Sequence, residues 1–235
     1  MKILLTGAAG QIGISLYQYL SLQHDCRCLD INPIPDAEDS VTADILDFEA
    51  VATAMEGRQT VIHLAANPSP KQSWEDVYTV SIAGTYNVFT AAKEAGVKKI
   101  IYASSIHVTK GWEKHKKKIR SDLPVRPDSL YGVGKSFGEA LGRFYADEYN
   151  ICVICLRIGA FISEPHFSDL NQRVAKAWCS PRDLAQLVSK CLEKDDLGFQ
   201  IFNAVSNNKN GFLDFSHAKK QVGYQPKDNS RQQIQ

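Results

Sequence analysis

The chain has 235 residues, of which 44% are hydrophobic and 23% charged, proportions typical of a folded protein with a sizeable core. Its formal net charge of +1 creates no overall field that would favour nucleic acid or an acidic membrane surface as a partner. No apolar run has the length of a membrane span, and the N-terminal run is too short for a signal peptide, so we expect a cytoplasmic protein.

The first predicted element is a buried strand from Lys2 to Thr6, which ends in the glycine-rich stretch Gly7-Ala-Ala-Gly-Gln-Ile-Gly13. Apolar residues at helical spacing follow from Ile12 onward. A strand, a glycine turn and a helix in this order are typical of dinucleotide binding. Gly7 permits a tight turn, Gly10 lets the backbone approach a pyrophosphate, and Gly13 lets the helix pack on the strand. The helix N-terminus then attracts the phosphates.

A second predicted strand, Cys26 to Leu29, leads directly into Asp30. An acid at this place can accept hydrogen bonds from the adenosine ribose hydroxyls, and it repels a 2′-phosphate. No arginine follows immediately, so the sequence favours NAD over NADP. Farther along, Asp44 either touches the adenine edge or is an ordinary loop acid. Asp47 is a predicted helix N-cap.

The middle of the chain brings a pair of serines to an edge of the predicted sheet. A third strand is predicted from Thr60 to Ala66, whose small-residue end leaves room for the cofactor, and His63 within it is interpreted as a core histidine. A helix is predicted from Asp76 to Gly96. The fourth strand, Lys98 to Ser104, then places Ser104 and Ser105 at the carboxyl edge, where open α/β sheets bind ligands.

Tyr131 and Lys135 are four residues apart on a helix predicted to run to about Asn150, so they share one face. An ammonium near a phenol lowers the phenol's pKa from its ordinary value of about 10. A tyrosine tuned in this way can take a proton from a substrate hydroxyl. A serine hydroxyl at the neighbouring strand end could hold the same oxygen. A tyrosine and a lysine at this spacing usually lie on the surface of a helix. The glycine turn at the N-terminus is what favours a catalytic role for them here.

The remaining elements complete the predicted architecture. The basic loop from Gly111 to Arg120 is interpreted as a solvated loop rather than a nucleic-acid site. The rest is predicted as a fifth strand from Ile151 to Ile158, an irregular stretch from Phe161 to Lys176, a helix starting at Ser180 and reaching Leu192, a strand from Phe199 to Ala204, and a loop-like polar tail from Ser206. The alternation predicts one α/β domain over residues 1–235, a three-layer doubly wound parallel sheet with a small C-terminal substrate region in segments 159–180 and 205–235.

The six cysteines indicate neither a disulfide framework nor a metal site. Cys152 and Cys155 have the spacing of a metal-binding pair, but they lie in a strand-like apolar run. Residues three apart on a strand point to opposite faces, and no second pair completes a set of ligands. We therefore expect buried reduced thiols and no metal.

As a set, these motifs resemble those of the extended short-chain dehydrogenases, the NAD-dependent epimerase/dehydratase superfamily, over about residues 1–205. Within it, the sequence is most similar to the uronate (hexuronic acid) dehydrogenases. The stretches that carry this narrower resemblance are Ser104-Ser-Ile-His107, Arg126-Pro-Asp-Ser-Leu-Tyr-Gly-Val-Gly-Lys135, Phe137-Gly-Glu139, Leu156-Arg-Ile-Gly159, Glu164-Pro165, Arg173 with Trp178, and Gly223-Tyr-Gln-Pro-Lys-Asp228.

The resemblance implies an NAD-dependent oxidoreductase that oxidises the anomeric hydroxyl of a cyclic sugar acid. In it, Tyr131 is the general base, Lys135 orients the nicotinamide ribose, and Ser105 binds the reacting oxygen. The implied cofactor residues are Gly7, Gly10, Gln11, Ile12, Gly13, Asp30, Asp44, Ile45, Leu64, Ala65, Ala66, Tyr131 and Lys135. The implied substrate residues are Ser69, Ser105, His107 and Arg173, the last gripping a carboxylate.

Two apolar residues depart from the uronate dehydrogenase pattern at positions that usually make polar substrate contacts. Ile106 stands where asparagine is usual, and Ala160 stands where serine is usual. Apolar side chains cannot hydrogen-bond sugar hydroxyls, so the substrate is left open. Two alternatives also remain, a nucleotide-sugar epimerase or dehydratase and a non-catalytic NAD sensor. A homo-oligomer is expected only by analogy with the superfamily.

Overall fold

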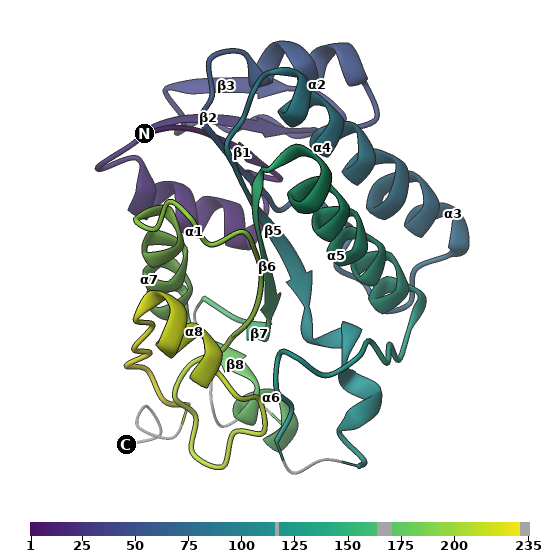
Figure 1. Ribbon diagram of the computed structural model, residues 1–235, viewed down its shortest axis with the longest axis vertical. Helices are drawn as coiled ribbons and strands as arrows, with labels where there is room; N and C mark the ends of the chain where they lie inside the picture. The colour runs from purple at the N-terminus through teal and green to yellow at the C-terminus, as the bar shows by residue number, and fades with distance from the viewer. Residues whose placement is uncertain (116–117, 164–170, 231–235) are drawn as a thin grey trace.

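A parallel sheet of seven strands runs through the centre of the computed structural model, which describes residues 1–115, 118–163 and 171–230 (Figure 1). The strand order is β3-β2-β1-β4-β5-β6-β9, so the chain moves outward from β1 to β3 and then crosses back to β4. The bounds are β1 Lys2–Thr6, β2 Asp25–Asp30, β3 Asp39–Thr42, β4 Thr60–His63, β5 Lys99–Ser105, β6 Cys152–Ile158 and β9 Phe199–Ala204. All seven carboxyl ends therefore meet at one edge, with the topological switch point between β1 and β4.

Helices cover both faces of this sheet. On one face lie α1 Gln11–Leu20, α7 Pro181–Leu192 and α8 Ser216–Val222, and on the other lie α2 Phe48–Met55, α4 Thr85–Glu94 and α5 Leu130–Tyr149. Side chains alternate along β1, since Ile3 and Leu5 join the core on the α1 side and Leu4 joins the core on the α4 side. The predicted three-layer doubly wound fold is confirmed.

The predicted strands are found, although β4 ends at His63 rather than at the predicted Ala66, and β3 was missed. Its four residues, Asp39-Ser-Val-Thr42, include a single apolar side chain and alternate between half-buried and exposed. This strand lies at the sheet edge and pairs with β2, where Arg27 forms an ion pair with Asp39 at 2.9 Å. A short polar edge strand lacks the apolar run by which buried strands are found in a sequence.

The helix predicted from Asp76 to Gly96 consists of three joined pieces. These are α3 Trp74–Asp76, a π-helix over Val77–Gly84, and α4. The π-helix lies close against α5, because a β-carbon at Gly134 would stand 2.8 Å from Cβ of Ser81. Apolar periodicity did predict helical structure here, but it could not distinguish the wider π turn.

The region after β6 contains more regular structure than predicted. The stretch expected to be irregular includes β7 Ala160–Phe161 and α6 Gln172–Lys176, and β7 pairs with β8 Trp178–Cys179 in a separate two-stranded sheet. The motif Glu164-Pro165 lies outside the described residues. Two 3-10 turns, Ile106–Val108 and Lys110–Trp112, follow β5.

The tail beyond Ser206 is not only loop, since it contains α8. Asp183 of α7 is fully buried and accepts hydrogen bonds from the backbone amides of Lys227 at 2.8 Å and Asp228 at 3.0 Å. The hydroxyl of Ser180, the N-cap of α7, donates to Asp228 at 2.6 Å. These contacts fix the tail against the start of α7.

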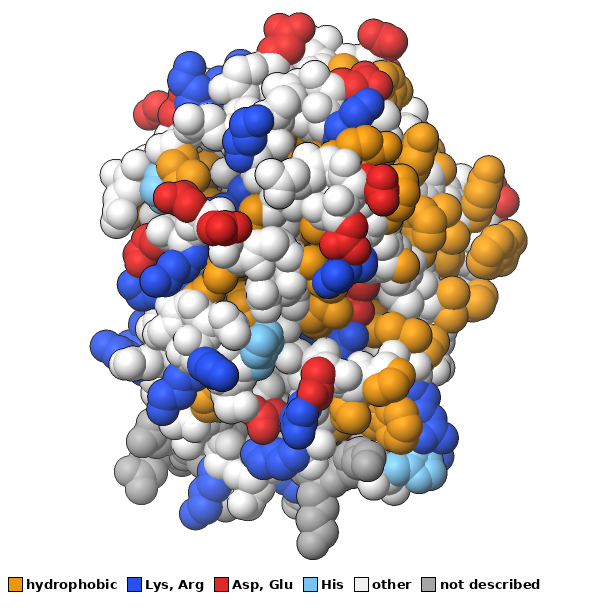
Figure 2. All heavy atoms as spheres, in the orientation of Figure 1, with side chains coloured by type: hydrophobic (Ala, Val, Ile, Leu, Met, Phe, Trp, Pro, Cys, Tyr) orange, Lys and Arg blue, Asp and Glu red, His pale blue; other side chains and the backbone are white. Residues whose placement is uncertain are grey.

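The surface carries a gathering of hydrophobic side chains along one edge. Figure 2 shows them on the right of the molecule, where Figure 1 draws α3. Trp74 and Tyr78 are 56% and 50% exposed, and their rings stack with centres 6.3 Å apart. No helix in the described ranges is long and apolar enough to cross a membrane. All six cysteines are free and buried.

Candidate active site

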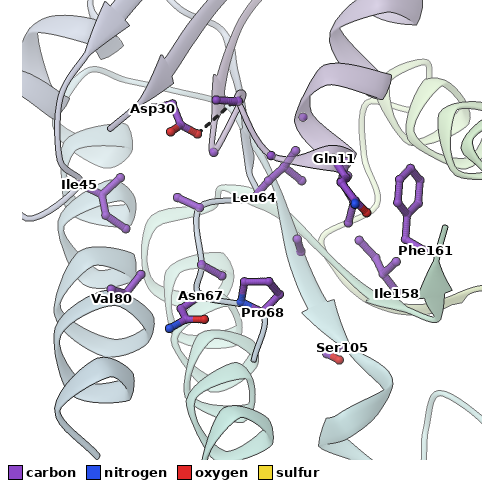
Figure 3. A pocket seen from close by; sticks show the side chains of 18 of the residues that line it. Gln11, Asp30, Ile45, Leu64, Asn67, Pro68, Val80, Ser105, Ile158 and Phe161 are labelled. Carbon is purple, nitrogen blue, oxygen red and sulfur yellow. Dashed lines mark hydrogen bonds between the residues drawn. The ribbon is translucent and has the colours of Figure 1, made fainter. Parts of the chain in front are cut away.

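A cavity of about 720 Å³ opens at the carboxyl edge of the sheet, at the switch point. Figure 3 shows Asp30 toward one end and Ser105 toward the other, with Gln11 and Phe161 on one side and Ile45 on the opposite side. Every residue predicted to bind the cofactor lines this cavity, and so do Ser105 and His107. Ser69 and Arg173 are not among its lining residues.

The glycine turn forms the wall beside α1, and its geometry requires glycine. Gly7 has a φ of 72°, and a β-carbon there would lie 2.5 Å from the amide nitrogen of Ala65. A β-carbon at Gly13 would lie 2.4 Å from the carbonyl oxygen of Gly7. Gly10, the N-cap of α1, provides no side-chain cap, so the first amides of the helix remain available to an anion. The turn therefore has the close approach and the donors that a pyrophosphate requires.

Asp30, at the end of β2, is held at the cavity wall by backbone donors. Its Oδ2 accepts from the amide of Ala9 at 3.0 Å, shown dashed in Figure 3, and its Oδ1 accepts from the amide of Asn32 at 2.9 Å. Neither Lys nor Arg forms an ion pair with Asp30 in the described part of the chain. A carboxylate fixed without a counter-ion suits ribose hydroxyls and repels a phosphate.

Tyr131 and Lys135 face the cavity from the first turns of α5. The helix begins after Ser129, whose hydroxyl accepts from the amide of Gly132 at 3.2 Å, so Tyr131 lies in the first turn beside the end of β5. A β-carbon at Gly138 would lie 2.2 Å from the Tyr102 ring, which shows how closely α5 packs on β5. This packing leaves Lys135 only 2% exposed.

Burial controls the ionisation of both groups. It raises the pKa of Tyr131, opposed by a hydrogen bond with Ser105, and it lowers the pKa of Lys135 from 10.5 to about 7. The expectation that Lys135 would lower the pKa of Tyr131 was wrong for this structure, because desolvation of the phenolate outweighs the hydrogen bond with Ser105, the one contact that lowers this pKa. The hydrogen bond itself supports the predicted grouping of Ser105 with Tyr131.

The ammonium of Lys135 has no hydrogen-bond or ion-pair partner among residues 1–115, 118–163 and 171–230. Its Nζ lies 4.9 Å from the centre of the Tyr102 ring and 5.9 Å from that of Tyr131. A buried ammonium is costly unless something accepts its hydrogen bonds. The hydroxyls of a nicotinamide ribose are acceptors of this kind, so the residues present fit a bound dinucleotide.

His63 belongs to the core, as predicted. It is 1% exposed, with Nδ1 at 2.7 Å from the Thr6 hydroxyl and Nε2 at 3.2 Å from the Thr85 hydroxyl. Burial lowers the pKa of this imidazole to about 3. His63 is thus a neutral link between β1, β4 and α4.

A buried ion pair holds the elements that carry the site together, and the sequence did not predict that its two residues are paired. Arg157 of β6 donates to both carboxylate oxygens of Glu139 in α5, each at 2.8 Å, and the Ser104 hydroxyl donates to Glu139 at 2.6 Å. Arg157 also donates to the carbonyl oxygen of Ser121 at 3.1 Å. These bonds join α5, β5 and β6 through Ser104, the residue next to Ser105. Sequence cannot predict this pairing, because a contact between residues 18 positions apart on different elements leaves no local pattern.

Only some of the predicted substrate residues line the cavity. His107 lines the cavity next to Ser105, whereas Ser69 is exposed outside it. Arg173 of α6 donates to both oxygens of Glu113, at 2.7 and 2.6 Å, so its guanidinium already holds a carboxylate of this chain. Its role in gripping substrate stays a prediction.

The two departures from the uronate dehydrogenase pattern have different environments. Ile106 is 4% exposed and packs with Ile119, Val205 and Leu213 in a small apolar cluster. Ala160 is half-buried in β7, where its amide donates to the Ala177 carbonyl at 2.8 Å. Ile106 therefore contributes to packing behind the cavity.

Comparison with known proteins identifies the family and several relatives of this chain. Residues 3–181 match the NAD dependent epimerase/dehydratase family. L-arabinose 1-dehydrogenase (NAD(P)(+)) from Haloferax volcanii is 36% identical, over 97% of this chain and 97% of the relative. Uronate dehydrogenase from Pseudomonas putida is 37% identical, over 97% of this chain and 85% of the relative.

A solved structure agrees with this placement. A point mutant of uronate dehydrogenase from Agrobacterium tumefaciens, complexed with NAD, matches with a TM-score of 0.89 and 32% identity, covering 98% of this chain and 86% of that chain. The prediction of NAD as the cofactor is confirmed at the level of the family and of these dehydrogenases. The chain belongs to the NAD dependent epimerase/dehydratase family.

Proposed function

We propose that this protein oxidises the anomeric C1 hydroxyl of a cyclic sugar or sugar acid, with Ser105, Tyr131 and Lys135 as its catalytic group. The observation that carries the proposal is their meeting in one cavity with the glycine turn and Asp30. NAD, when bound, supplies the acceptor for the hydride that leaves the carbon. The relatives named above, an L-arabinose dehydrogenase and a uronate dehydrogenase, support a sugar as the substrate class.

Each residue has a distinct task in this reaction. Ser105 binds the reacting oxygen, and Tyr131 accepts the proton that the hydroxyl loses. Lys135 binds the nicotinamide ribose through its unpaired Nζ, which can donate a hydrogen bond both as the ammonium and as the neutral amine that forms above its lowered pKa of about 7. Because burial raises the pKa of Tyr131, the phenolate fraction grows with pH, and oxidation should be faster above neutral pH.

The residues at the substrate end of the cavity suit a sugar, whether neutral or carrying a carboxylate. His107 and Ser105 offer polar groups there, and Phe161 and Ile158 offer apolar surface. For a sugar acid, Arg173 would have to leave Glu113 or bind both carboxylates. We propose that segments 159–180 and 205–235, in so far as they are described, shape this end. We also propose a cytoplasmic enzyme, in keeping with six free thiols.

The test is a panel of aldoses, uronates and nucleotide-diphosphate sugars, each supplied with NAD while NADH absorbance is followed. We expect NADH to form with at least one aldose or uronate, and to form faster at pH 9 than at pH 7. NAD binding without NADH from any sugar would refute the proposal in favour of a sensor. Tight binding and conversion of a nucleotide-diphosphate sugar without net NADH would refute it in favour of an epimerase.

A further inference from the structure

Tyr102 is a buried aromatic residue of β5 that the proposed reaction does not use. Its side chain is 0% exposed, and Nζ of Lys135 lies over its ring, 4.9 Å from the ring centre. At this distance the electron-rich face of an aromatic ring attracts an ammonium. The centre of the Tyr131 ring is 5.9 Å from the same nitrogen, so Tyr102 is the nearer of the two rings. This contact joins a core residue to the cation that lines the cavity.

The sequence of α5 brings these two side chains together. Gly138 follows Lys135 by three residues, so both lie on the same face of the helix. A β-carbon at Gly138 would lie 2.2 Å from Cζ and 2.5 Å from Cε1 of Tyr102, so the ring fills the space that a side chain would take. Phe89 meets this ring edge-on with centres 6.1 Å apart, and the His63 ring is centred 5.7 Å away. The surrounding core therefore fixes the ring beside Lys135.

The hydroxyl of Tyr102 does not explain the contact. It is buried and reaches no hydrogen-bond partner at normal distance in the part of the chain that the structure describes. Burial raises the pKa of this phenol well above its ordinary value, and Thr85 opposes the rise only in part. A buried hydroxyl without a partner costs stability. What Tyr102 offers to Lys135 is therefore the face of its ring.

The other groups around Lys135 supply no free negative charge at neutral pH. The titratable groups near it are neutral there because they are buried; these are His63 of β4, Tyr102 of β5, Tyr131 of α5 and Cys155 of β6. Glu139, one turn farther along α5, has its charge paired with Arg157. Val77 and Ser81 of the π-helix, which pack against α5, carry no charge. Among the described residues, the aromatic faces are thus what favours the charged form of Lys135.

We propose that Tyr102 is a positioning residue for Lys135, and that the face of its ring keeps the buried Nζ charged and available to the ribose hydroxyls of the cofactor. The inference rests on the proposed function, in which Lys135 binds that ribose. Burial by itself pushes Lys135 toward the neutral amine, since desolvation lowers its pKa to about 7. The ring opposes this loss of charge, and a charged donor binds a hydroxyl more strongly than a neutral amine does. A weaker ring face should therefore weaken NAD binding near neutral pH.

The test places phenylalanine and its fluorinated forms at position 102, because each fluorine withdraws electron density from the ring face with little change in size. NMR of ¹³C-labelled lysine side chains measures the pKa of Lys135, whose signal is the one missing from Lys135→Met. Tyr102→Phe should keep this pKa close to that of the wild type, whereas pentafluorophenylalanine should lower it by about one unit. A pKa that stays constant along the series would refute the proposal.

The same proteins should differ in NAD binding, measured by calorimetric titration. At pH 8 the pentafluorophenylalanine protein should bind NAD about fivefold more weakly than Tyr102→Phe, because less of its Lys135 is charged. At pH 5 Lys135 is charged in both, and the two Kd values should agree within about twofold. Equal affinities at pH 8, or an equal loss at both pH values, would refute a role for the ring in holding the charge.

Phe202→Leu is the control for a general loss of packing. Phe202 is a fully buried ring that joins the core on the opposite face of the sheet from Tyr102. This variant should leave the pKa of Lys135 at the wild-type value, and a fall as large as that caused by pentafluorophenylalanine would refute the proposal. If the pKa and NAD binding follow the ring but no sugar is oxidised, the proposed function fails while the role of Tyr102 stands. If a sugar is oxidised and the pKa ignores the ring, only the role of Tyr102 fails.

Discussion

Two buried lysines mark the opposite edges of the central sheet. Lys99, at the amino edge, is 4% exposed, and its Nζ donates to the carbonyl oxygens of Cys191, Leu192 and Lys194 at 2.9, 2.9 and 2.7 Å. Lys135, at the carboxyl edge, is 2% exposed and has no such partner in the described residues. The Lys99 ammonium has a structural role, since it donates hydrogen bonds to carbonyl oxygens at the C-terminal end of α7 that would otherwise lack partners. The Lys135 ammonium lacks hydrogen-bond acceptors until a ligand binds, so the carboxyl edge is the functional edge of the sheet.

Replacing each lysine by methionine tests this difference, and it should give the largest effect on stability. Between pH 7 and 10.5 the unfolded chain binds more protons at residue 135 than the folded chain does, so wild-type stability rises with pH through this window. The penalty from Lys135 is complete below pH 7. Lys135→Met should therefore raise the free energy of unfolding by about 2–4 kcal/mol at pH 6 and by much less at pH 10.

Lys99→Met is the matched control, because it leaves three carbonyl oxygens without their donor. It should lower the free energy of unfolding by about 1–3 kcal/mol at pH 6 and pH 8. Urea titrations of the ligand-free proteins measure both variants. If Lys99→Met raised the free energy of unfolding, or if both variants lowered it equally, the proposed difference between a structural and a functional lysine would be wrong.

Asp30 tests the carboxyl edge from the cofactor side. Asp30→Asn keeps the size of the side chain but removes the charge that favours ribose hydroxyls and repels a 2′-phosphate. We expect NAD to bind about tenfold more weakly, while NADP binds no more weakly than to the wild type. Calorimetric titration with each dinucleotide measures the change. An unaltered preference for NAD over NADP would show that Asp30 only closes the turn through Ala9 and Asn32.

Glu113 tests the substrate side, where we expect the smallest effect. The ion pair with Arg173 is partly exposed, 36% for the arginine and 20% for the glutamate, so its contribution is modest. Glu113→Gln should free the guanidinium and lower the KM for a uronate a few-fold, with no change for a neutral aldose. A parallel fall for both sugars would show that Arg173 does not read the substrate's charge.

The parts of the fold that sequence could predict are those with local signals. The glycine turn and the apolar strands β1 and β9 were placed from consecutive residues, as was the N-cap Ser180 of α7. The edge strand β3 was missed because it is short and polar. Helix α8 was missed because its residues, with Lys219 and Lys220, look like solvated tail until Ala218 and Val222 are seen packed in the core.

The candidate site divides in the same way. Tyr131 and Lys135 were predicted to act together because they are four positions apart on one helix. The pairs Arg173 with Glu113 and Arg157 with Glu139 join distant parts of the chain, so only the fold reveals them. The direction of the pKa shift of Tyr131 was also beyond the sequence, because it depends on how deeply the phenol is buried.

The most direct test of the account is Tyr131→Phe, measured for NAD binding and for oxidation of the sugar identified by the panel. The variant keeps the ring against His107 and removes only the group that accepts the proton. We predict a loss of kcat of about 10²–10⁴-fold with the Kd for NAD changed by less than about threefold. Oxidation at the wild-type rate would contradict the assignment of Tyr131 as the base.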